Sequence, residues 1–372
     1  MVSSQSAWVH TGYAQQIIFG VDAIESVADA LKTIGLRRVL VVTTQGRMMS
    51  DVGIRFHKVL GRSAAAIYDD VQSHVPTETV HEGLDLARKE RVDGIVSFGG
   101  GSCADTGKAI AFFAEQAEGV PGTSHVDRAV LPHVSIPTTY SGAELTPFFG
   151  MTDHATRQKT GAGGPTTAPV VAIYDPRATL DLPPDISAET AMNALAHGVE
   201  AVYSPRCTPE AEAIALASIR RIADAIPRVV EGPDDLDART DMFAGAALAG
   251  RCLQNSSMGI HHALAQMVGG RTGIPHGRAN AVLLSKVVAF NELAAPEAVR
   301  KIGVALGDPD DAAGAIDRLR ARLGLPDGLA AAGVSDDDIA AVAQLATQNF
   351  LVQNNVRRAS PEEIEALLAA AR

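Results

Sequence analysis

Three polar side chains recur at helical spacing in an otherwise apolar stretch near the middle of the chain. Asn193 and His197 are four residues apart, and Glu200 follows three residues later. Residues at these spacings share one face of an α-helix. An amide, an imidazole and a carboxylate in one row on a buried helix raise two possibilities, a metal ion or an organic anion as the bound group.

Further histidines lie in the same predicted helical region. His261 and His262 open a helical segment, and His276 follows Pro275 after a short loop. A lone histidine on an apolar face is usually a satisfied core residue, but several in one region favour a shared site. Imidazoles with one carboxylate are typical ligands of zinc or iron(II). Position 193 holds Asn, and a neutral amide is a poor ligand for such ions, so the sequence favours a site without a metal.

A glycine-rich turn links a strand predicted over residues 93–98 to a helix predicted over 104–115. The turn consists of Gly99, Gly100, Gly101 and Ser102. Ligands bind at the carboxyl ends of parallel strands, and a helix N-terminus attracts anions, so this order predicts a phosphate-binding site. A plain turn is the alternative. Asp105, in the first turn of the helix, is either a cap or a ligand contact.

Two other loops carry polar groups suited to a dinucleotide. Thr138, Thr139 and Ser141 follow another predicted strand, where they either hold phosphate and ribose oxygens or form a Ser/Thr turn. Thr43 ends a further strand, at a place where an acidic residue would bind the ribose 2′-hydroxyl and repel a 2′-phosphate. No acidic residue stands at the end of this strand, so we expect the protein to accept both NADH and NADPH. Lys159 is either a surface lysine or a contact from a loop folded over the cofactor.

The first half of the chain alternates strands and helices, which predicts a parallel sheet covered on both faces. Strands are predicted over residues 38–44, 65–68, 93–98, 133–137 and 168–174, and helices over 77–90 and 104–115. From Ala188 onward only helical patterns recur, with breaks at prolines that include Pro227. The sequence predicts a Rossmann-like, NAD(P)-binding α/β domain over 1–162 and an all-helical substrate domain over 163–372. We expect the division near the Gly/Pro/Thr-rich segment 161–167 and the active site in a cleft between the domains.

Composition excludes several classes of function. The chain has 372 residues and a formal charge of −11 without a basic cluster, which argues against nucleic-acid binding. No apolar run reaches the length of a membrane span. Three widely spaced cysteines predict neither a disulfide framework nor a CxxC metal site. The first residues lack the charged and apolar regions of a signal peptide, so we expect a cytoplasmic protein.

Several motifs together resemble the iron-containing alcohol dehydrogenase superfamily, the group III dehydrogenases. They are Phe19-Gly20, GGGS (99–102), IPTT (136–139), YDP (174–176), NALAHGVEA (193–201), HHALAQMVGG (261–270) and PHGRANAVLL (275–284). Within this superfamily the chain is most similar to the maleylacetate reductases, on the segment 137–147, the pair Asn193 and His197, the double histidine 261–262 and the C-terminal Asn-Val-Arg at 355–357. Related proteins are commonly dimers, so the resemblance implies a homodimer.

The resemblance also implies a set of site residues. Metal-dependent members bind the ion through an Asp and three His, which correspond here to Asn193, His197, His262 and His276. Maleylacetate reductases lack that Asp and are regarded as independent of metal. The resemblance therefore implies a vacated metal site whose imidazoles are retained for an anionic substrate, and no metal is expected.

The implied reaction is the reduction of the carbon–carbon double bond of maleylacetate by NAD(P)H to give 3-oxoadipate. Negative charge develops on the enolate oxygen, and a protonated histidine or another donor aimed at that oxygen is expected to stabilise it in place of a Lewis acid. Arg278 and Arg357 are candidates for the two carboxylates of this small dicarboxylate, and a surface ion pair is the alternative for each.

One difference from the pattern of this superfamily leaves other functions open. Gln266 stands where many relatives have a His, and Gln cannot exchange a proton near neutral pH. The alternatives are a metal-dependent (iron or zinc) alcohol dehydrogenase, a reductase of another oxo-acid or enone, and a non-redox or catalytically silent nucleotide-binding protein.

Overall fold

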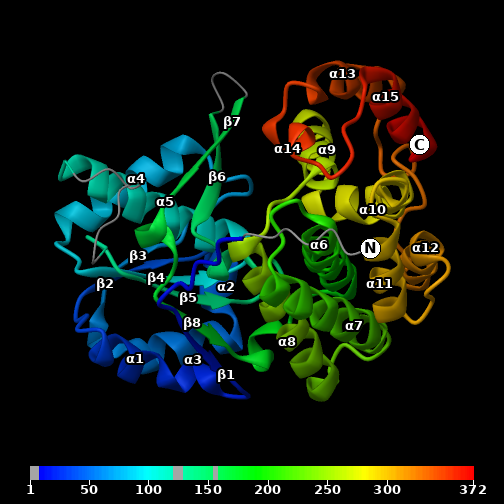
Figure 1. The fold of residues 1–372 in the computed structure, drawn as a ribbon. Helices are drawn as coiled ribbons and strands as arrows, with labels where there is room; N and C mark the ends of the chain where they lie inside the picture. The colour runs from blue at the N-terminus through cyan, green and yellow to red at the C-terminus, as the bar shows by residue number, and fades with distance from the viewer. Residues whose placement is uncertain (1–7, 120–128, 154–157) are drawn as a thin grey trace. The chain divides into compact units, whose positions relative to one another are not determined.

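The described part of the chain divides into two compact units. The computed structural model describes residues 8–119, 129–153 and 158–372, without the side chains of 158 and 159 (Figure 1). The sheet unit spans Gly12–Asp181, and the helical unit comprises Leu182–Arg372 together with residues 8–11. An α/β unit followed by an all-helical unit confirms the predicted fold class. The location of the active site between domains stays a prediction.

A six-stranded sheet with the order β1-β8-β5-β4-β2-β3 forms the centre of the sheet unit, and its neighbouring strands are all parallel. The strands are β1 (Gln16–Phe19), β2 (Val39–Val42), β3 (Ala64–Tyr68), β4 (Gly94–Gly99), β5 (His133–Pro137) and β8 (Val171–Tyr174). The inner strands are fully buried, as expected for a parallel sheet covered on both faces. The chain runs from β2 outward to β3 and then returns to β4 on the other side, so the winding direction reverses between β2 and β4.

Helices cover the two faces of this sheet. They are α1 (Val27–Thr33), α2 (Gln45–Met49), α3 (Asp51–Leu60), α4 (Thr77–Lys89) and α5 (Gly101–Ala117). Successive side chains of a strand point to opposite faces. Val41 of β2 accordingly packs in one core with Phe56 of α3, whereas Val42 packs in the other core with Leu84 of α4 and Ile110 of α5. The strands and helices predicted for this unit are confirmed, whereas β1, α1, α2 and α3 were missed.

An antiparallel hairpin, β6 (Phe148–Asp153) with β7 (Gln158–Gly163), was also missed by the sequence analysis. It projects from the sheet unit in Figure 1. The first residues of the segment 161–167, predicted as an interdomain loop, belong to β7. β8 still pairs with β5 and β1 after this segment, so the division falls after Asp181 and not at the predicted boundary of 162/163.

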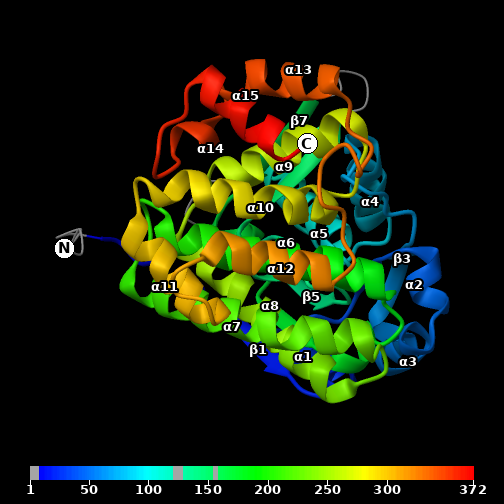
Figure 2. The ribbon, with the colours of Figure 1, turned by 90° about the vertical axis from the view of Figure 1, so that its right-hand side faces the viewer.

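Ten helices of the described chain build the helical unit. They are α6 (Pro184–Tyr203), α7 (Pro209–Glu231), α8 (Leu236–Cys252), α9 (Ile260–Thr272), α10 (His276–Glu292), α11 (Pro296–Leu306), α12 (Ala312–Arg322), α13 (Asp336–Ala346), α14 (Phe350–Gln353) and α15 (Pro361–Ala370). α10 packs against α6, α9 and α12, and Figure 2 shows it running alongside α12. Pro227 lies inside α7, so the predicted break there is wrong. Among the described residues, every helix is too short or too polar to cross a membrane.

A buried polar chain joins β4 to β5 in the sheet unit. His133 Nε2 lies 2.7 Å from Ser97 Oγ, and this hydroxyl lies 2.8 Å from Ser135 Oγ. The imidazole packs against α5 at Gly107, where a Cβ would lie 2.9 Å from the ring. Burial, followed by the charge of Lys108, lowers the pKa of His133 from its ordinary value of 6.5 to about 3. The ring is therefore neutral in the folded protein at physiological pH.

Replacing His133 with Gln is expected to weaken the loss of stability in acid. The unfolded chain binds a proton at this imidazole below its ordinary pKa of 6.5, whereas the folded protein does not until about pH 3. The stabilising contribution is thus complete above the unfolded pKa and is lost as the pH falls. As the pH is lowered from about 5.5 to about 4, the free energy of unfolding of both proteins falls. The wild type should lose about 1.4 kcal/mol more than His133→Gln for each pH unit. Urea unfolding measures both, and parallel curves would contradict the assignment.

Candidate active site

α6 carries the polar face that its spacing predicted. The helix is buried from Ala191 to Tyr203, and Asn193, His197 and Glu200 are 8%, 7% and 0% exposed. Polar groups on a helix this deep must find partners inside the protein, because water cannot reach them. The neighbours of these side chains therefore define the site.

Three histidine rings from three helices lie together in the helical unit. The ring of His262, near the start of α9, stacks on that of His197 with their centroids 4.7 Å apart and their planes 14° apart. His276, the first residue of α10, lies 6.1 Å from His262 between ring centroids. The structure thus brings together the three histidines that the sequence selected. We call His197, His262 and His276 the histidine cluster.

Asn193 is tied to α10 beside this cluster. The side-chain amide of Asn280 donates one hydrogen bond to Asn193 Oδ1 at 3.0 Å and another to the backbone carbonyl of His276 at 2.9 Å. Asn280 is fully buried. Sequence analysis did not select Asn280, because no local pattern shows that one amide links two helices. The contact fixes the side chain of Asn193 against the helix that presents His276.

Burial determines the charge of His197, the member of the cluster on α6. Burial is the main cause that lowers the pKa of His197 well below its ordinary value, and the charges of His262 and His261 lower it further. Burial also lowers the pKa of the adjacent His261 to about 4. A protonated imidazole as stabiliser of an enolate is therefore wrong for His197, because the desolvation cost of its charge keeps it neutral. A neutral ring offers a nitrogen lone pair instead.

Both candidate arginines form ion pairs within the helical unit. Arg278 contacts the buried carboxylate of Glu189, with its Nη2 2.6 Å from Oε1. Arg357 donates to Glu363 at 2.6 Å and to the backbone carbonyl of Phe290 at 2.9 Å, and it stacks on the Phe290 ring. These contacts give Arg357 a structural role in the C-terminal segment. Arg278 is a third exposed, and its contact with a substrate carboxylate stays a prediction.

Gln266 lies four residues after His262 on α9, one helical turn along the same face. It is half-buried. This position is next to the cluster along the helix, as the resemblance implied, and its side chain offers hydrogen bonds without a transferable proton near neutral pH.

In the sheet unit, the ends of three adjacent strands meet at the glycine turn. Thr43 after β2 donates its hydroxyl hydrogen to the carbonyl of Phe98 in β4 at 2.7 Å. The backbone N–H of Thr138 after β5 donates to the carbonyl of Gly99 at 2.9 Å. The winding of the sheet reverses between β2 and β4, and such a reversal is where open α/β sheets bind ligands at their carboxyl edge. The glycine turn therefore occupies the expected position for a nucleotide.

The backbone of the turn is packed too closely for side chains. A Cβ at Gly100 would lie 3.2 Å from Thr139 Cγ2, and one at Gly101 would lie 3.1 Å from Ser141 Cβ. α5 begins at Gly101, so its free N–H groups lie at this turn, with half-buried Ser102 in the first helical turn. Backbone N–H groups without covering side chains form a cradle that suits a phosphate.

Asp105 is neither a cap nor a free surface carboxylate. The N-cap of α5 is Gly100, without a side-chain hydrogen bond. Asp105 Oδ1 instead pairs with Lys108 Nζ at 2.8 Å, and its Oδ2 accepts the N–H of Gly150 at 3.4 Å. The capping alternative is therefore wrong, and a cofactor contact stays a prediction. Lys159 lies in β7, and its side chain is outside the described part of the structure.

Lys108 is a residue that sequence analysis missed. It is fully buried, and its ammonium group donates to the carbonyls of Ala143 and Phe148 at 2.8 and 2.5 Å and to Thr146 Oγ1 at 3.0 Å. A buried cation needs such partners to offset its lost hydration. Lys108 thus anchors the segment that follows Ser141 to α5. Only the tertiary structure shows that this lysine is internal.

The comparisons with known proteins decide the family. Residues 14–176 match the iron-containing alcohol dehydrogenase family, and residues 187–372 match the C-terminal domain of the Fe-containing alcohol dehydrogenase family. The chain belongs to the iron-containing alcohol dehydrogenase family. The resemblance inferred from the sequence motifs is confirmed, and so is the class of enzyme, an NAD(P)H-dependent oxidoreductase.

Several relatives are similar along their whole length. The chain is 35% identical to the maleylacetate reductase of Pseudomonas knackmussii, over 98% of this chain and 97% of that one. It is 30% identical to the NAD-dependent methanol dehydrogenase of Bacillus methanolicus, over 94% and 96%. The crystal structure of maleylacetate reductase from Rhizobium sp. strain MTP-10005 is 34% identical with a TM-score of 0.88, covering 99% of this chain and 98% of that chain.

The family overturns the expectation that no metal is used, because an iron-containing family implies a metal cofactor. The residues present fit such an ion. The histidine cluster supplies three imidazoles, a nitrogen ligand set that suits zinc or iron(II). Nδ1 of His197 is buried and makes no hydrogen bond within the described structure. The amide at position 193 does not exclude a metal, because three imidazoles already form a suitable ligand set and burial makes His197 a neutral donor.

A Gly100→Val substitution is expected to weaken NADPH binding at least about tenfold. Its branched side chain would press on Thr139 and cover the backbone at the start of α5, where a phosphate needs direct access. Fluorescence titration with NADPH measures the dissociation constant. Gly270→Val is the control, because position 270 is exposed with open space around its Cα. An unchanged dissociation constant in folded Gly100→Val would show that the turn does not hold the cofactor.

Proposed function

We propose that this protein is an NAD(P)H-dependent reductase that converts maleylacetate to 3-oxoadipate during the breakdown of aromatic compounds. The observation that carries the proposal is similarity over 79–98% of the chain to seven maleylacetate reductases, at 32–37% identity. The histidine cluster and the glycine turn supply the two binding regions that this reaction requires. The proposal retains a homodimer in the cytoplasm as the expected form of the enzyme.

The glycine turn is the proposed site of the cofactor phosphates. Gly100, Gly101 and Ser102 offer backbone N–H groups at the start of α5, Gly99 precedes them as the last residue of β4, and Thr138, Thr139 and Ser141 border the turn. Thr43 lies at the end of β2, on the other side of the winding reversal. No acidic side chain follows at position 44 or 45, so the proposed site accepts the 2′-phosphate of NADPH as well as the 2′-hydroxyl of NADH.

The histidine cluster is the proposed metal site, with His197, His262 and His276 as the ligands. A divalent ion bound there would act as a Lewis acid toward a substrate oxygen. Asn193 lies beside the cluster and is held by Asn280, so it borders the site with a fixed amide. Arg278 remains the candidate for a substrate carboxylate, with Glu189 orienting its guanidinium group.

The proposed reaction consumes one NAD(P)H and one proton for each double bond reduced. Hydride adds to the alkene carbon β to the ketone, the electron pair moves onto the ketone oxygen to form an enolate, and a proton then adds to the α-carbon to give 3-oxoadipate and NAD(P)⁺. Gln266 cannot supply that proton near neutral pH. Its amide is suited instead to holding a substrate oxygen, which makes position 266 a determinant of substrate choice.

A metal-dependent alcohol dehydrogenase is the second candidate. It is favoured by the three-imidazole cluster and by the similarity to the NAD-dependent methanol dehydrogenase of Bacillus methanolicus. The reactions differ in the bond that changes: the alternative interconverts a carbonyl and an alcohol and leaves alkenes intact. Substrate trials therefore separate the two functions.

The purified protein is expected to oxidise NADH or NADPH when maleylacetate is added and to form 3-oxoadipate. His276→Ala should lower kcat at least about a hundredfold, because it removes a ligand from the site. The NADPH dissociation constant of His276→Ala should stay near the wild-type value, because the glycine turn proposed to bind the cofactor does not include His276. The measurements are loss of absorbance of the reduced cofactor and product analysis. Turnover of simple alcohols or aldehydes without turnover of maleylacetate would instead support the second candidate.

A further inference from the structure

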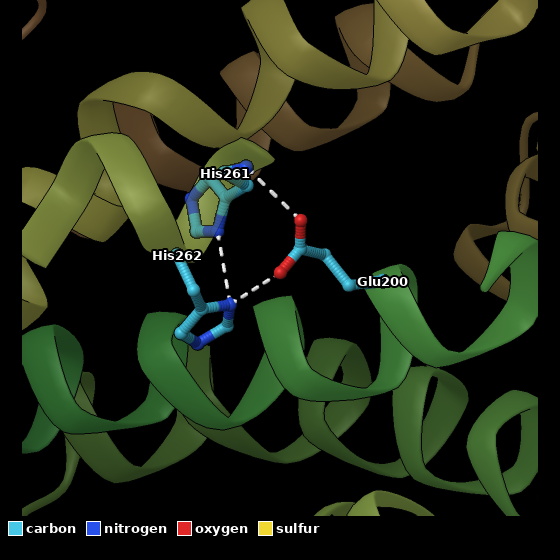
Figure 3. A group of neighbouring side chains, drawn as sticks. All are labelled: Glu200, His261 and His262. Carbon is cyan, nitrogen blue, oxygen red and sulfur yellow. Dashed lines mark hydrogen bonds and ion pairs between the residues drawn. The ribbon is translucent and has the colours of Figure 1, made fainter. Parts of the chain in front are cut away.

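Glu200 lies at the centre of a buried hydrogen-bond network at the start of α9. Its Oε2 accepts the N–H of Gly259 at 3.0 Å and lies 2.6 Å from His262 Nδ1, while its Oε1 accepts the backbone N–H of His261 at 3.0 Å. Figure 3 shows the carboxylate facing both histidines. Glu200 is fully buried, so these donors take the place of water around it. One side chain of α6 thus holds both the beginning of α9 and a ring of the histidine cluster.

The partners of each ring determine which nitrogen carries the proton. His261 Nε2 lies 3.0 Å from the backbone carbonyl of Asn280, which only accepts, so His261 Nε2 is the N–H. His262 Nδ1 faces a carboxylate oxygen of Glu200, so His262 Nδ1 is also an N–H. A neutral imidazole has one N–H and one lone pair. In the neutral form of His262, the lone pair is therefore on Nε2.

A metal ion among Glu200, His261 and His262 is the rival interpretation, because one ligand atom from each lies within 4.8 Å of the others. An ion there would have to displace the N–H groups of Gly259 and His261 from the carboxylate and remove the proton from His262 Nδ1. The short contact at 2.6 Å fits a charge-assisted hydrogen bond. The geometry therefore favours a supporting network over a second ion site.

We propose that Glu200 is a positioning residue for the metal site: it fixes His262 with its proton on Nδ1 and presents the Nε2 lone pair to the ion. Its bonds to Gly259 and His261 also set where α9 begins, and so hold the ring of His262 against that of His197. A carboxylate on the far nitrogen makes an imidazole a stronger ligand. The inference rests on the metal site of the proposed function and not on the proposed substrate.

Glu200→Gln tests this role. The amide oxygen of Gln can still accept one N–H, but its NH₂ group is a donor and would face another N–H donor. The position of the proton on His262 is then no longer fixed. Zn²⁺ is the probe, with its dissociation constant measured at neutral pH by competition with a colorimetric chelator after the protein is stripped of metal. The variant should bind Zn²⁺ about 10- to 100-fold more weakly than the wild type. Equal affinity would overturn the proposal.

Asp317→Asn is the matched control in the same unit. Asp317 of α12 accepts from Ser285 and Lys286 of α10 at 2.7 and 3.0 Å, so its loss weakens packing around α10 without touching the three histidines. Its Zn²⁺ affinity should stay within about twofold of the wild type, even if its melting temperature falls. A loss of affinity as large as that of Glu200→Gln would show that general destabilisation explains the effect, and would overturn the proposal.

Glu200→Asp keeps the charge on a side chain one methylene shorter. The Zn²⁺ affinity of Glu200→Asp should lie between those of the wild type and Glu200→Gln. If Glu200→Gln does not fold, Glu200→Asp alone tests the proposal, and an affinity of Glu200→Asp equal to that of the wild type would overturn it. A wild-type protein that binds no Zn²⁺ would also overturn the proposal. Maleylacetate turnover is not measured in these titrations, so an error in the substrate leaves their outcome unchanged.

Discussion

The buried carboxylate of Glu200 is the constraint on which the helical unit depends. A charged group without water costs several kcal/mol unless hydrogen-bond donors replace its hydration. Burial accordingly raises the pKa of Glu200, while the nearby His261 and the backbone N–H groups around it act in the opposite direction. These donors lie at the start of α9, so satisfying the carboxylate fixes α9 against α6. The stacking of His262 on His197 follows from that alignment.

The two units divide the chemistry between two kinds of binding surface. In the sheet unit, α5 begins at Gly101 beside the reversal of winding between β2 and β4, and the backbone N–H groups at the start of a helix suit a phosphate. In the helical unit, burial keeps the imidazole of His197 neutral, and a neutral imidazole suits a cation. One site depends on the absence of side chains, whereas the other depends on three side chains held in place.

Local periodicity and chain order predicted much of this arrangement. The spacing of Asn193, His197 and Glu200 identified a helix face, and a strand followed by glycines and a helix identified the turn after β4. The hairpin of β6 and β7 was missed because its Gly- and Thr-rich strands read as a loop. The protonated histidine was a wrong prediction, because the depth of His197 is a property of tertiary packing.

The side-chain contacts between helices could not be predicted from the sequence. Glu200 was seen on the correct face, but its partners at Gly259 and His262 lie some sixty residues away along the chain. In the sequence, Asn280 and Lys108 look like ordinary polar residues on helices, but in the structure both are fully buried and hold neighbouring segments together. The expectation of no metal came from judging position 193 alone. The donor set became visible only when the rings of three helices were placed together.

The most direct test of this account is the protonation state of His262 in the metal-free protein at neutral pH. Nitrogen NMR of isotope-labelled histidine side chains measures it, with His262 assigned by comparison with a His262→Gln variant. The account predicts that Nδ1, the nitrogen facing Glu200, carries a proton. A ring whose single proton is on Nε2 would contradict it.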